Sequence, residues 1–358
     1  MRIKSSMEDS FTISKKMPNE LCLKPLDSAR YVMQHAKHVS ISIDGIKKVA
    51  AMISNKIMDG ECTIEEWSKK PLHPKEANEQ AIDWIFLVDT LNFSFWSDSN
   101  DSYEKVYKGK RYHGYEALCA AINQAIDNGI DILNASYYSQ MTMTDFIKIF
   151  QSDSSYEMPL LNERLQVLHE TGQILIDKYS GHFSNCIRQA NLNAHTLLDF
   201  IVDNFPSYRD EAVYHAQRVS FYKRAQILIA DIWACFRGQD LGHFHDIDTI
   251  TMFADYRVPQ VLFYYHVLIY TDKLVARLKH EMLPNGDKDE VEIRAAAIVA
   301  TQLIVNCINE ELPLEKDLGD GGSRINNILV DYYLWDLRRE KQVELIETPF
   351  HRTRCIYY

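Results

Sequence analysis

Asp255 is the residue of this chain whose neighbours most suggest catalysis. It lies in the segment FADYRVPQ (253–260), between the aromatic residues Phe253 and Tyr256 and four residues before Pro259. Because proline is favoured in the first turn of a helix, the carboxylate is expected near a helix N-terminus, where the helix dipole stabilises its charge. The common role of such an aspartate is a helix cap, worth about 1 kcal/mol. The flanking aromatic residues favour a base-binding cleft to the same degree, so both interpretations stay open.

Two other segments carry side chains that could recognise a flat, hydrogen-bonding ligand. Three aromatic residues fall within four positions of DTLNFSFW (89–96). They could stack on a heterocycle, although packing in a core is the commoner use of aromatic residues. In LVDYYLWDLRR (329–339), Tyr332 and Asp336 share one helical face, with Asp331 about 140° away from Asp336. The two carboxylates could reach one pocket from its edges, or they could pair with the arginines that follow them.

The histidines and cysteines do not form a recognisable metal or redox motif. The segment GHFHDIDT (242–249) has two histidines and two aspartates, but histidines two apart lie on different faces of a helix. Hydrated turn residues are therefore the favoured interpretation. No two of the seven cysteines are spaced as CxxC, which favours reduced thiols. His73 precedes Pro74 and is expected in extended backbone, where a solvated loop histidine is the simplest assignment.

Composition and missing motifs exclude several function classes. The chain has no GxGxxG, P-loop, HExxH or GxSxG sequence, so neither a cofactor nor a metal is expected. Lys+Arg 39 against Asp+Glu 50 gives a net charge of −11, which argues against binding through nucleic-acid phosphates. The longest apolar stretch, 261–270, has ten residues, whereas a membrane span needs about 20. Since the N-terminus also has no apolar core of signal-peptide length, a cytoplasmic protein is expected.

Helical periodicity dominates the elements that must position these side chains. Of the 358 residues, 46% are hydrophobic and 25% charged, which is typical of a globular protein. Segment 223–236 is apolar on most faces and predicts a buried central helix, and Pro259 places a helix start within 249–270. Further helices are expected at 27–36, with Asp27 as a cap, in the first half of 77–96, and at 113–128, 158–179, 183–205, 289–309 and 323–340.

The predicted fold is mainly α, without a central parallel sheet. No βαβ alternation occurs, and no Asn-Gly hairpin lies between alternating runs. Residues 1–24 are polar and aperiodic and are expected to form a mobile N-terminal tail. Residues 25–358 are expected to form a single compact helical domain, or two intimately packed helical lobes.

Four separated segments, taken together, resemble the queuosine salvage protein family. They are DTLNFSFW (89–96), KRAQILIADIW (223–233), FADYRVPQ (253–260) and LVDYYLWDLRR (329–339), and the resemblance extends over about residues 27–339. It implies a fold similar to that of the helix-hairpin-helix DNA glycosylases. It also implies a queuosine 5′-phosphate N-glycosidase, a hydrolase that releases the base queuine from queuosine 5′-monophosphate for insertion into tRNA by a separate transglycosylase.

The resemblance assigns roles to individual residues. Asp255 corresponds to the catalytic aspartate at the start of a helix, and 223–236 to the second helix of the pair before it. The substrate-binding residues that it implies are His73, Phe253, Tyr256, Asp331, Tyr332 and Asp336. We add Lys223 as the cation for the 5′-phosphate. Segment 217–223 has no glycine, whereas the DNA-repair enzymes hold DNA phosphate with a glycine-rich hairpin. Together with the acidic net charge, this difference favours a free nucleotide over a duplex.

The implied reaction suits a single carboxylate. Breaking an N-glycosidic bond builds positive charge at the sugar C1′, which a nearby carboxylate stabilises or attacks. Queuine is a 7-deazaguanine without an N7 to protonate, so help for the leaving base must reach other atoms, and a carboxyl of raised pKa is a suitable donor. Asp331 and Asp336 could instead accept from base N–H groups or pair with the ammonium of queuine.

Two other functions stay open at this point. A DNA base-excision glycosylase would share the implied fold, although the missing hairpin glycines and the acidic charge oppose it. A non-catalytic, nucleotide-binding helical protein would use the same pocket, with Asp255 only a cap. The main interpretation expects the nucleotide and queuine as partners, with no direct nucleic-acid contact and no membrane.

Overall fold

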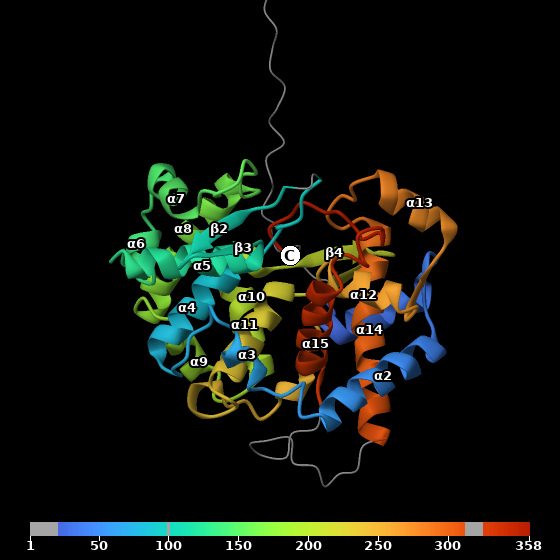
Figure 1. The fold of residues 1–358 in the computed structure, drawn as a ribbon. Coiled ribbons are helices and arrows are strands. Elements are labelled where there is room, and N and C mark those ends of the chain that lie inside the picture. The colour runs from blue at the N-terminus through green and yellow to red at the C-terminus, as the bar shows by residue number, and fades with distance from the viewer. Residues whose placement is uncertain (1–20, 99–100, 312–324) are drawn as a thin grey trace, which may run out of the picture.

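The computed structural model describes residues 21–98, 101–311 and 325–358, and it consists mainly of helices (Figure 1). The longer helices are α1 (Pro25–His35), α2 (Ile43–Met58), α4 (Glu79–Thr90), α5 (Tyr115–Asp127), α7 (Met143–Phe150), α8 (Leu161–Tyr179), α10 (Ala194–Asn204), α11 (Lys223–Cys235), α12 (Val258–Tyr264), α13 (Asp272–His280), α14 (Lys288–Glu311) and α15 (Asn327–Glu340). Shorter ones are α3 (Glu66–Lys69), α6 (Ala135–Tyr138) and α9 (Ser184–Gln189), with 3-10 turns η1 (Pro206–Tyr208), η2 (Asp240–Gly242) and η3 (Ile247–Thr249).

The strands of the described chain form separate two-stranded antiparallel sheets. β2 (Glu104–Tyr107) and β3 (Lys110–His113) make one hairpin, and β4 (Glu211–Tyr214) and β5 (Gln217–Ser220) make another. β1 (Val39–Ile41) pairs with the distant β6 (Leu268–Tyr270). Among the described residues no central parallel sheet occurs, which confirms the predicted mainly α fold.

The helices pack as two lobes around one continuous hydrophobic core (Figure 1). One lobe contains α3 to α10, and the other contains α1, α2, α12, α13 and α14. α11 packs on α4 and α10 of the first lobe, and α15 packs on α12 and α14 of the second. The first described helices belong to the second lobe, because α1 and α2 pack on α14 and β1 pairs with β6. The N-terminal helices are therefore built into the same lobe as the C-terminal third of the chain.

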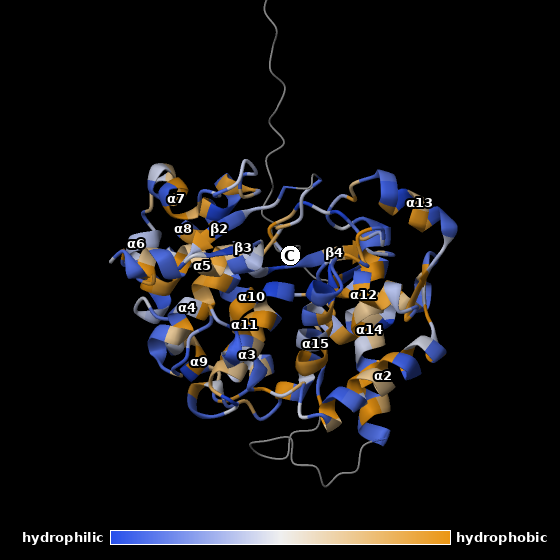
Figure 2. Cartoon of the chain, viewed as in Figure 1, coloured by the Kyte–Doolittle hydropathy of each residue, from blue (hydrophilic) through white to orange (hydrophobic). Residues whose placement is uncertain are grey.

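α11 and α14 are the helices most enclosed by the rest of the protein. Almost every residue of α11 is buried, as its apolar residues on most faces predict. α14 is the one helix in the described ranges that is long and apolar enough to cross a membrane, yet 72% of its apolar window is buried inside the protein. Figure 2 shows largely orange and pale colour on α14, whereas α13 at the periphery is mainly blue. α14 therefore has the surroundings of a core helix.

Several helix boundaries differ from the sequence predictions for local reasons. α1 begins two residues before Asp27, which lies in the first turn and is not the cap. The helix predicted at 183–205 is divided into α9 and α10, because Asn191 and Leu192 adopt left-handed backbone (φ 51° and 59°). α12 ends at Tyr264, and the segment after it extends into β6.

The predicted N-terminal tail, residues 1–24, lies outside the described residues except for 21–24. These last residues run beside β5, where the N–H of Leu23 donates to the carbonyl of Arg218 (3.1 Å). The hydroxyl of Ser220 donates in turn to the carbonyl of Leu23 (2.6 Å). Residues 21–24 therefore belong to the folded protein.

Candidate active site

A cavity of about 830 Å³ lies where the two lobes meet. Its walls come mainly from the loop 92–97, from α11, from the turn 253–257 and from α15. The predicted site residues that line it are His73, Lys223, Phe253, Asp255, Tyr256, Asp331 and Tyr332. Asp336 is not among its lining residues. Segments that are far apart in the sequence thus converge on one space, as the family resemblance implied.

Asp255 caps a helix and lines the cavity at the same time. Its Oδ1 accepts the backbone N–H groups of Arg257 (2.8 Å) and Val258 (2.9 Å) at the start of α12. Pro259 lies in the first turn of α12, as predicted. The second oxygen, Oδ2, accepts no hydrogen bond from the described residues. The capping bonds thus occupy one oxygen of a residue that also lines the cavity, and a role of Asp255 toward a bound base stays a prediction.

Lys223 neutralises a group of buried carboxyls. Burial raises the pKa of Asp255, and the charge of Lys223 opposes that rise more than any other group does. Burial lowers the pKa of Lys223 itself, against the attraction of Asp255, Asp89 and Asp331. The Nζ of Lys223 also donates to the carbonyl of Asn92 (3.3 Å). The charge of Lys223 therefore acts on the carboxyls of the cavity, and its contact with a 5′-phosphate stays a prediction.

Asp331 and Asp231 place two further carboxyls on the cavity wall, from α15 and α11. The Oδ2 of Asp331 accepts the N–H of Phe253 (3.0 Å), which ties α15 to the turn that carries Asp255. Burial and then the charge of Asp255 raise the pKa of Asp331 well above its usual range. Asp231 accepts from the hydroxyl of Tyr332 (2.5 Å), and burial raises the pKa of Asp231 to about 6. Both carboxyls are therefore better able to hold a proton near neutral pH than an exposed aspartate.

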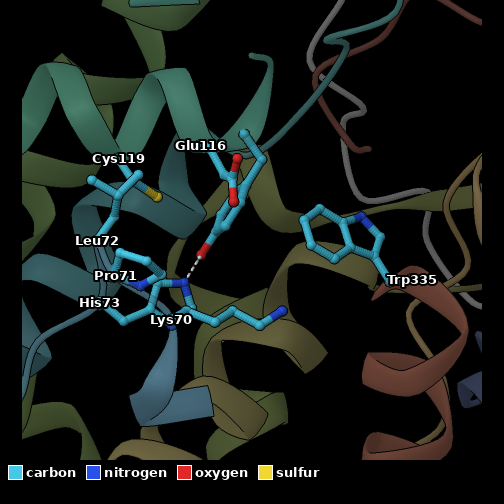
Figure 3. Close-up of a pocket in the computed structure, with 8 residues that line it drawn as sticks. Lys70, Pro71, Leu72, His73, Glu116, Cys119 and Trp335 are labelled. Atoms are coloured by element: carbon cyan, nitrogen blue, oxygen red, sulfur yellow. Dashed lines mark hydrogen bonds between the residues drawn. The ribbon is translucent and has the colours of Figure 1, made fainter. Parts of the chain in front are cut away.

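His73 is buried, and both of its ring nitrogens are hydrogen-bonded; the dashed line in Figure 3 marks the bond to Tyr115. Nδ1 lies 3.0 Å from the carbonyl of Trp67 and so carries the hydrogen, while Nε2 accepts from the hydroxyl of Tyr115 (3.1 Å). Burial and the charge of Lys70 lower the pKa of His73 to about 3. A side pocket of about 10 Å³ between these residues and Trp335 shares their side chains with the main cavity. His73 is thus a neutral part of the wall and not a solvated loop residue.

Asp336 lies at the rim of the cavity and forms an ion pair with Lys70, which lines it. Its side chain is 39% exposed, and its carboxylate accepts from the Nζ of Lys70 (2.9 Å). Lys70 lines the cavity and lies over the ring of Trp335, 4.7 Å from the ring centre. Arg339 of the same helix pairs with Glu116 instead. The sequence left open that Asp336 forms an ion pair. It does so, but with Lys70 and not with the arginines that follow it.

The aromatic residues of segment 89–96 pack in the interior and also border the cavity, while their stacking on a heterocycle stays a prediction. Phe93 and Trp96 are each 1% exposed, so they are packed as core residues. The same two side chains border the cavity, together with the half-buried Phe95. Trp96 is further fixed because its indole N–H donates to the carbonyl of Thr353 (2.9 Å).

Cationic side chains donate to the backbone carbonyls of residues 90–94. We call these five carbonyls the 90–94 carbonyl row. Thr90 accepts from Arg224 (2.5 Å), Leu91 and Phe93 from Arg164, Asn92 from Lys223 (3.3 Å) and Ser94 from Arg354 (3.1 Å). Arg164 and Arg224 are almost fully buried, and burial lowers the pKa of Arg164 to about 9. Sequence analysis missed these residues. The available signal was the presence of charged residues inside otherwise apolar helices, as in KRAQILIADIW (223–233).

Arg294 of α14 supports the turn that carries Asp255. Its Nε donates to the carbonyl of Ala254 (2.8 Å), and its guanidinium pairs with Asp210 (2.5 Å) and Glu290 (3.1 Å). The carboxylate of Asp210 also accepts the first backbone N–H of α11 (3.1 Å). One buried arginine therefore connects α14, the start of α11 and the turn that carries Asp255.

The residues that the structure describes do not include a group of three or more His, Cys, Asp or Glu that could hold a metal ion. The two histidines of segment 242–249 contact each other, with Nε2 of His243 3.2 Å from Nδ1 of His245. Both are exposed in the turn after α11 and lie outside the cavity lining.

Comparison with known proteins gives matches over most of the chain. The family described as queuosine salvage protein matches residues 72–358. A Mus musculus protein named queuosine 5′-phosphate N-glycosylase/hydrolase is 46% identical over 340 residues, which cover 94% of this chain and 99% of the relative. Proteins of the same name from Schizosaccharomyces pombe and Sphaerobacter thermophilus are 38% and 36% identical, each over 93% of this chain. These matches cover 99% and 97% of the two relatives.

The matched region, residues 72–358, includes Asp231, Asp255 and Asp331 of the cavity wall. The four segments that carried the resemblance also meet at this one cavity or directly behind it. The chain belongs to the queuosine salvage protein family.

Proposed function

We propose that this chain hydrolyses the N-glycosidic bond of queuosine 5′-monophosphate and releases queuine, with Asp255 as the catalytic carboxylate. The divided use of Asp255 is the observation that carries this proposal: two backbone N–H groups fix Oδ1, and Oδ2 is left to a ligand. The relatives named queuosine 5′-phosphate N-glycosylase/hydrolase support the reaction class. The cavity of about 830 Å³ has a suitable size, since small-molecule sites measure about 300–1,000 Å³.

The carboxylate of Asp255 acts on the charge that develops as the bond breaks. When the C1′–N bond lengthens, its electron pair leaves with the base and the sugar C1′ becomes positive. Oδ2 opposes that charge or attacks C1′, and the capping hydrogen bonds hold the carboxylate in place beforehand. Lys223 favours the ionised form that this role needs. A water molecule then supplies the hydroxyl of ribose 5-phosphate, and queuine takes up a proton.

The base end of the cavity supplies hydrogen bonds and that proton. Asp331 and Asp231 are buried carboxyls of raised pKa on two sides of the cavity, and a protonated carboxyl is a donor suited to a base without N7. The rings of Phe253, Tyr256 and Tyr332 line the same space and offer flat surfaces for the base.

Asp336 contributes to substrate recognition by exchanging its present partner, the ammonium of Lys70, for the ammonium of queuine. The Nζ of Lys70 lies between the carboxylate of Asp336 and the face of Trp335, which is a favourable position for any ammonium group. The ammonium of queuine has the same chemistry and replaces Lys70 there when the substrate binds. This exchange keeps Asp336 in the recognition role that the family resemblance implied.

A free nucleotide fits the cavity better than duplex DNA does. α10 and α11 are joined through η1 and the β4–β5 hairpin, whose turn is formed by His215 and Ala216 and contains no glycine. Asp231, Asp255 and Asp331 on the cavity wall and the net charge of −11 would repel the phosphate backbone of duplex DNA. We therefore propose the nucleotide and queuine as the partners, without a direct nucleic-acid or membrane contact.

All seven cysteines are free thiols, which supports a cytoplasmic location that cell fractionation can test.

One incubation tests the proposed function. The purified protein is mixed with queuosine 5′-monophosphate or with duplex DNA containing damaged bases, and free base is measured by mass spectrometry. We expect queuine from the nucleotide and no base from the duplex. An Asp255→Asn protein is the matched control, because it keeps the cap and loses the charge. Binding of the nucleotide without any release of queuine would favour the non-catalytic alternative.

A further inference from the structure

The backbone directly before Lys223 is strained and must be held by other groups. Tyr222, the residue before α11, adopts left-handed backbone (φ 49°, ψ 41°), which is unfavourable for a residue with a Cβ atom. Such a conformation persists only where the surrounding structure enforces it, and strained residues of this kind cluster at functional sites. Lys223 is the first residue of α11 and lines the cavity, so this turn determines where its ammonium group lies.

Asp210 holds the start of α11 in this position. Its Oδ2 accepts the backbone N–H of Lys223 (3.1 Å), and its carbonyl accepts the N–H of Phe221 (3.0 Å). Asp210 is 3% exposed, so both bonds are shielded from water. The strained Tyr222 is therefore fixed between two residues whose backbone N–H groups Asp210 binds.

Arg294 joins Asp210 to the turn that carries Asp255. Its Nη1 and Nη2 donate to the two oxygens of Asp210 (2.9 and 2.5 Å). Its Nε donates to the carbonyl of Ala254 (2.8 Å), the residue before Asp255. Because the N–H groups of arginine form a fixed planar fork, these bonds set the distance between the two backbone segments that they hold. The guanidinium is thus a rigid spacer between the start of α11 and the turn 253–257.

The guanidinium of Arg294 is itself held in place by its neighbours. It lies over the rings of Phe221 and Tyr358, 4.2 and 4.0 Å from their centres. Glu290 accepts from its Nη1 (3.1 Å) and also from the hydroxyl of Tyr358 (2.7 Å). Packing on the face of the guanidinium and hydrogen bonds in its plane therefore give the spacer one position.

The distance that this spacer sets controls the charges of the site. Burial raises the pKa of Asp255, and the charge of Lys223 opposes that rise more than any other group does. The attraction between two charges falls with their distance, and misplacement of a reacting group by about 1 Å can cost on the order of 10²-fold in rate. A shift of α11 relative to the turn would therefore make ionised Asp255 less favourable and move it away from C1′.

We propose that Arg294 is a positioning residue of the reaction and that it sets the distance between Lys223 and Asp255. Neither Arg294 nor Asp210 lines the cavity, so both act through other residues and not on the substrate. The inference rests on the proposed function, in which Asp255 is the catalytic carboxylate. Arg294→Lys keeps the positive charge beside the two buried carboxylates, but one ammonium group cannot reproduce the fork. We expect its single-turnover rate to fall by roughly 10- to 100-fold, with binding of the nucleotide changed by less than about threefold.

The test compares Arg294→Lys with Arg277→Lys as a matched control. Arg277 of α13 is likewise held by two carboxylates, those of Asp287 (2.8 Å) and Asp289 (2.5 Å), and it lies outside the cavity lining. Single-turnover cleavage of queuosine 5′-monophosphate, nucleotide binding and the melting temperature are measured on both proteins. We expect slower cleavage in Arg294→Lys alone. A folded Arg294→Lys protein that cleaves at the rate of the wild type would overturn the inference.

A double variant separates positioning from a general loss of folded protein. Asp255→Asn already lacks the carboxylate that Arg294 positions, so adding Arg294→Lys should slow it by much less than it slows the wild type. A loss of folded protein would instead lower both rates by the same factor, and that result would overturn the inference. If the wild type releases no queuine, or if Asp255→Asn alone cleaves as fast as the wild type, it is the proposed function that fails.

Asp210→Asn keeps the inference testable if Arg294→Lys does not fold. This variant leaves Arg294 in a balanced pair with Glu290, keeps one oxygen for the N–H of Lys223, and removes one of the two oxygens that the guanidinium binds. We expect slower cleavage with binding retained, and a weaker effect in the Asp255→Asn background. Cleavage at the rate of the wild type would overturn the inference, and so would loss of the folded state, because the network would then serve stability only.

Discussion

Replacing Asp255 by asparagine separates the two uses of this side chain. The amide oxygen of asparagine can accept the N–H groups of Arg257 and Val258 as Oδ1 does now, and asparagine caps a helix as well as aspartate. The free energy of unfolding should therefore change by less than about 1 kcal/mol. The position of Oδ2 becomes a neutral NH₂ group, which no longer opposes positive charge at C1′. Loss of one well-placed electrostatic contact costs about 10²- to 10³-fold in rate.

The change at Asp255 also alters its neighbour. Asp255 is the strongest of the charges that oppose the lowering of the pKa of Lys223 by burial, so this pKa should fall further in Asp255→Asn. The assay is single-turnover cleavage of queuosine 5′-monophosphate, with binding of the nucleotide and the melting temperature measured on the same samples. We expect slow cleavage with nearly unchanged binding and melting, since the loss falls on the transition state. Cleavage at a rate near that of the wild type would show that Asp255 is only a cap and that the reasoning fails.

Three other substitutions test the surroundings of this site. Asp331→Ala should weaken binding of queuine by about 1–3 kcal/mol in isothermal titration, because it leaves polar groups of the base unpaired; binding equal to that of the wild type would refute the recognition role. Arg294→Met should lower the free energy of unfolding in urea by about 3–5 kcal/mol, because it leaves Asp210 and Glu290 as unpaired buried charges, and a loss below about 1 kcal/mol would contradict this account. The pKa of Asp231 is raised from 3.8 to about 6, so the folded state binds more protons and stability falls as the pH rises between these values. Urea unfolding at several pH values should show a weaker fall in Asp231→Asn, and identical slopes would count against the raised pKa.

The sequence could predict the features that depend on neighbouring residues. The apolar faces of 223–236 predict the buried α11, and Pro259 predicts the start of α12. The position of Asp255 before that helix predicts the hydrogen bonds that its carboxylate accepts from the first N–H groups of the helix. These predictions succeed because helix periodicity and capping act within one or two turns of the chain.

The sequence could not predict contacts between distant segments. The electrostatic surroundings of Lys223 depend on Asp89, Asp255 and Asp331, which lie more than 30 residues away on either side, so its neighbours in the sequence do not reveal them. Gln260 accepts hydrogen bonds from Arg257 and Arg338, and this arrangement likewise needs α12 and α15 to pack together. Both Arg338 and Arg339 line the cavity, and no local pattern shows that Arg339 pairs with Glu116 whereas Arg338 donates to Gln260.

The 90–94 carbonyl row has a consequence for how the enzyme opens and closes. Its five carbonyls are bound by side chains of α8, α11 and the segment after α15, so this wall can swing outward only if several charge-assisted hydrogen bonds break together. Amide hydrogen exchange should accordingly be slow in this loop. Val343 and Ile346 also border the cavity and are 78% and 74% exposed, so their segment is expected to exchange faster than the loop.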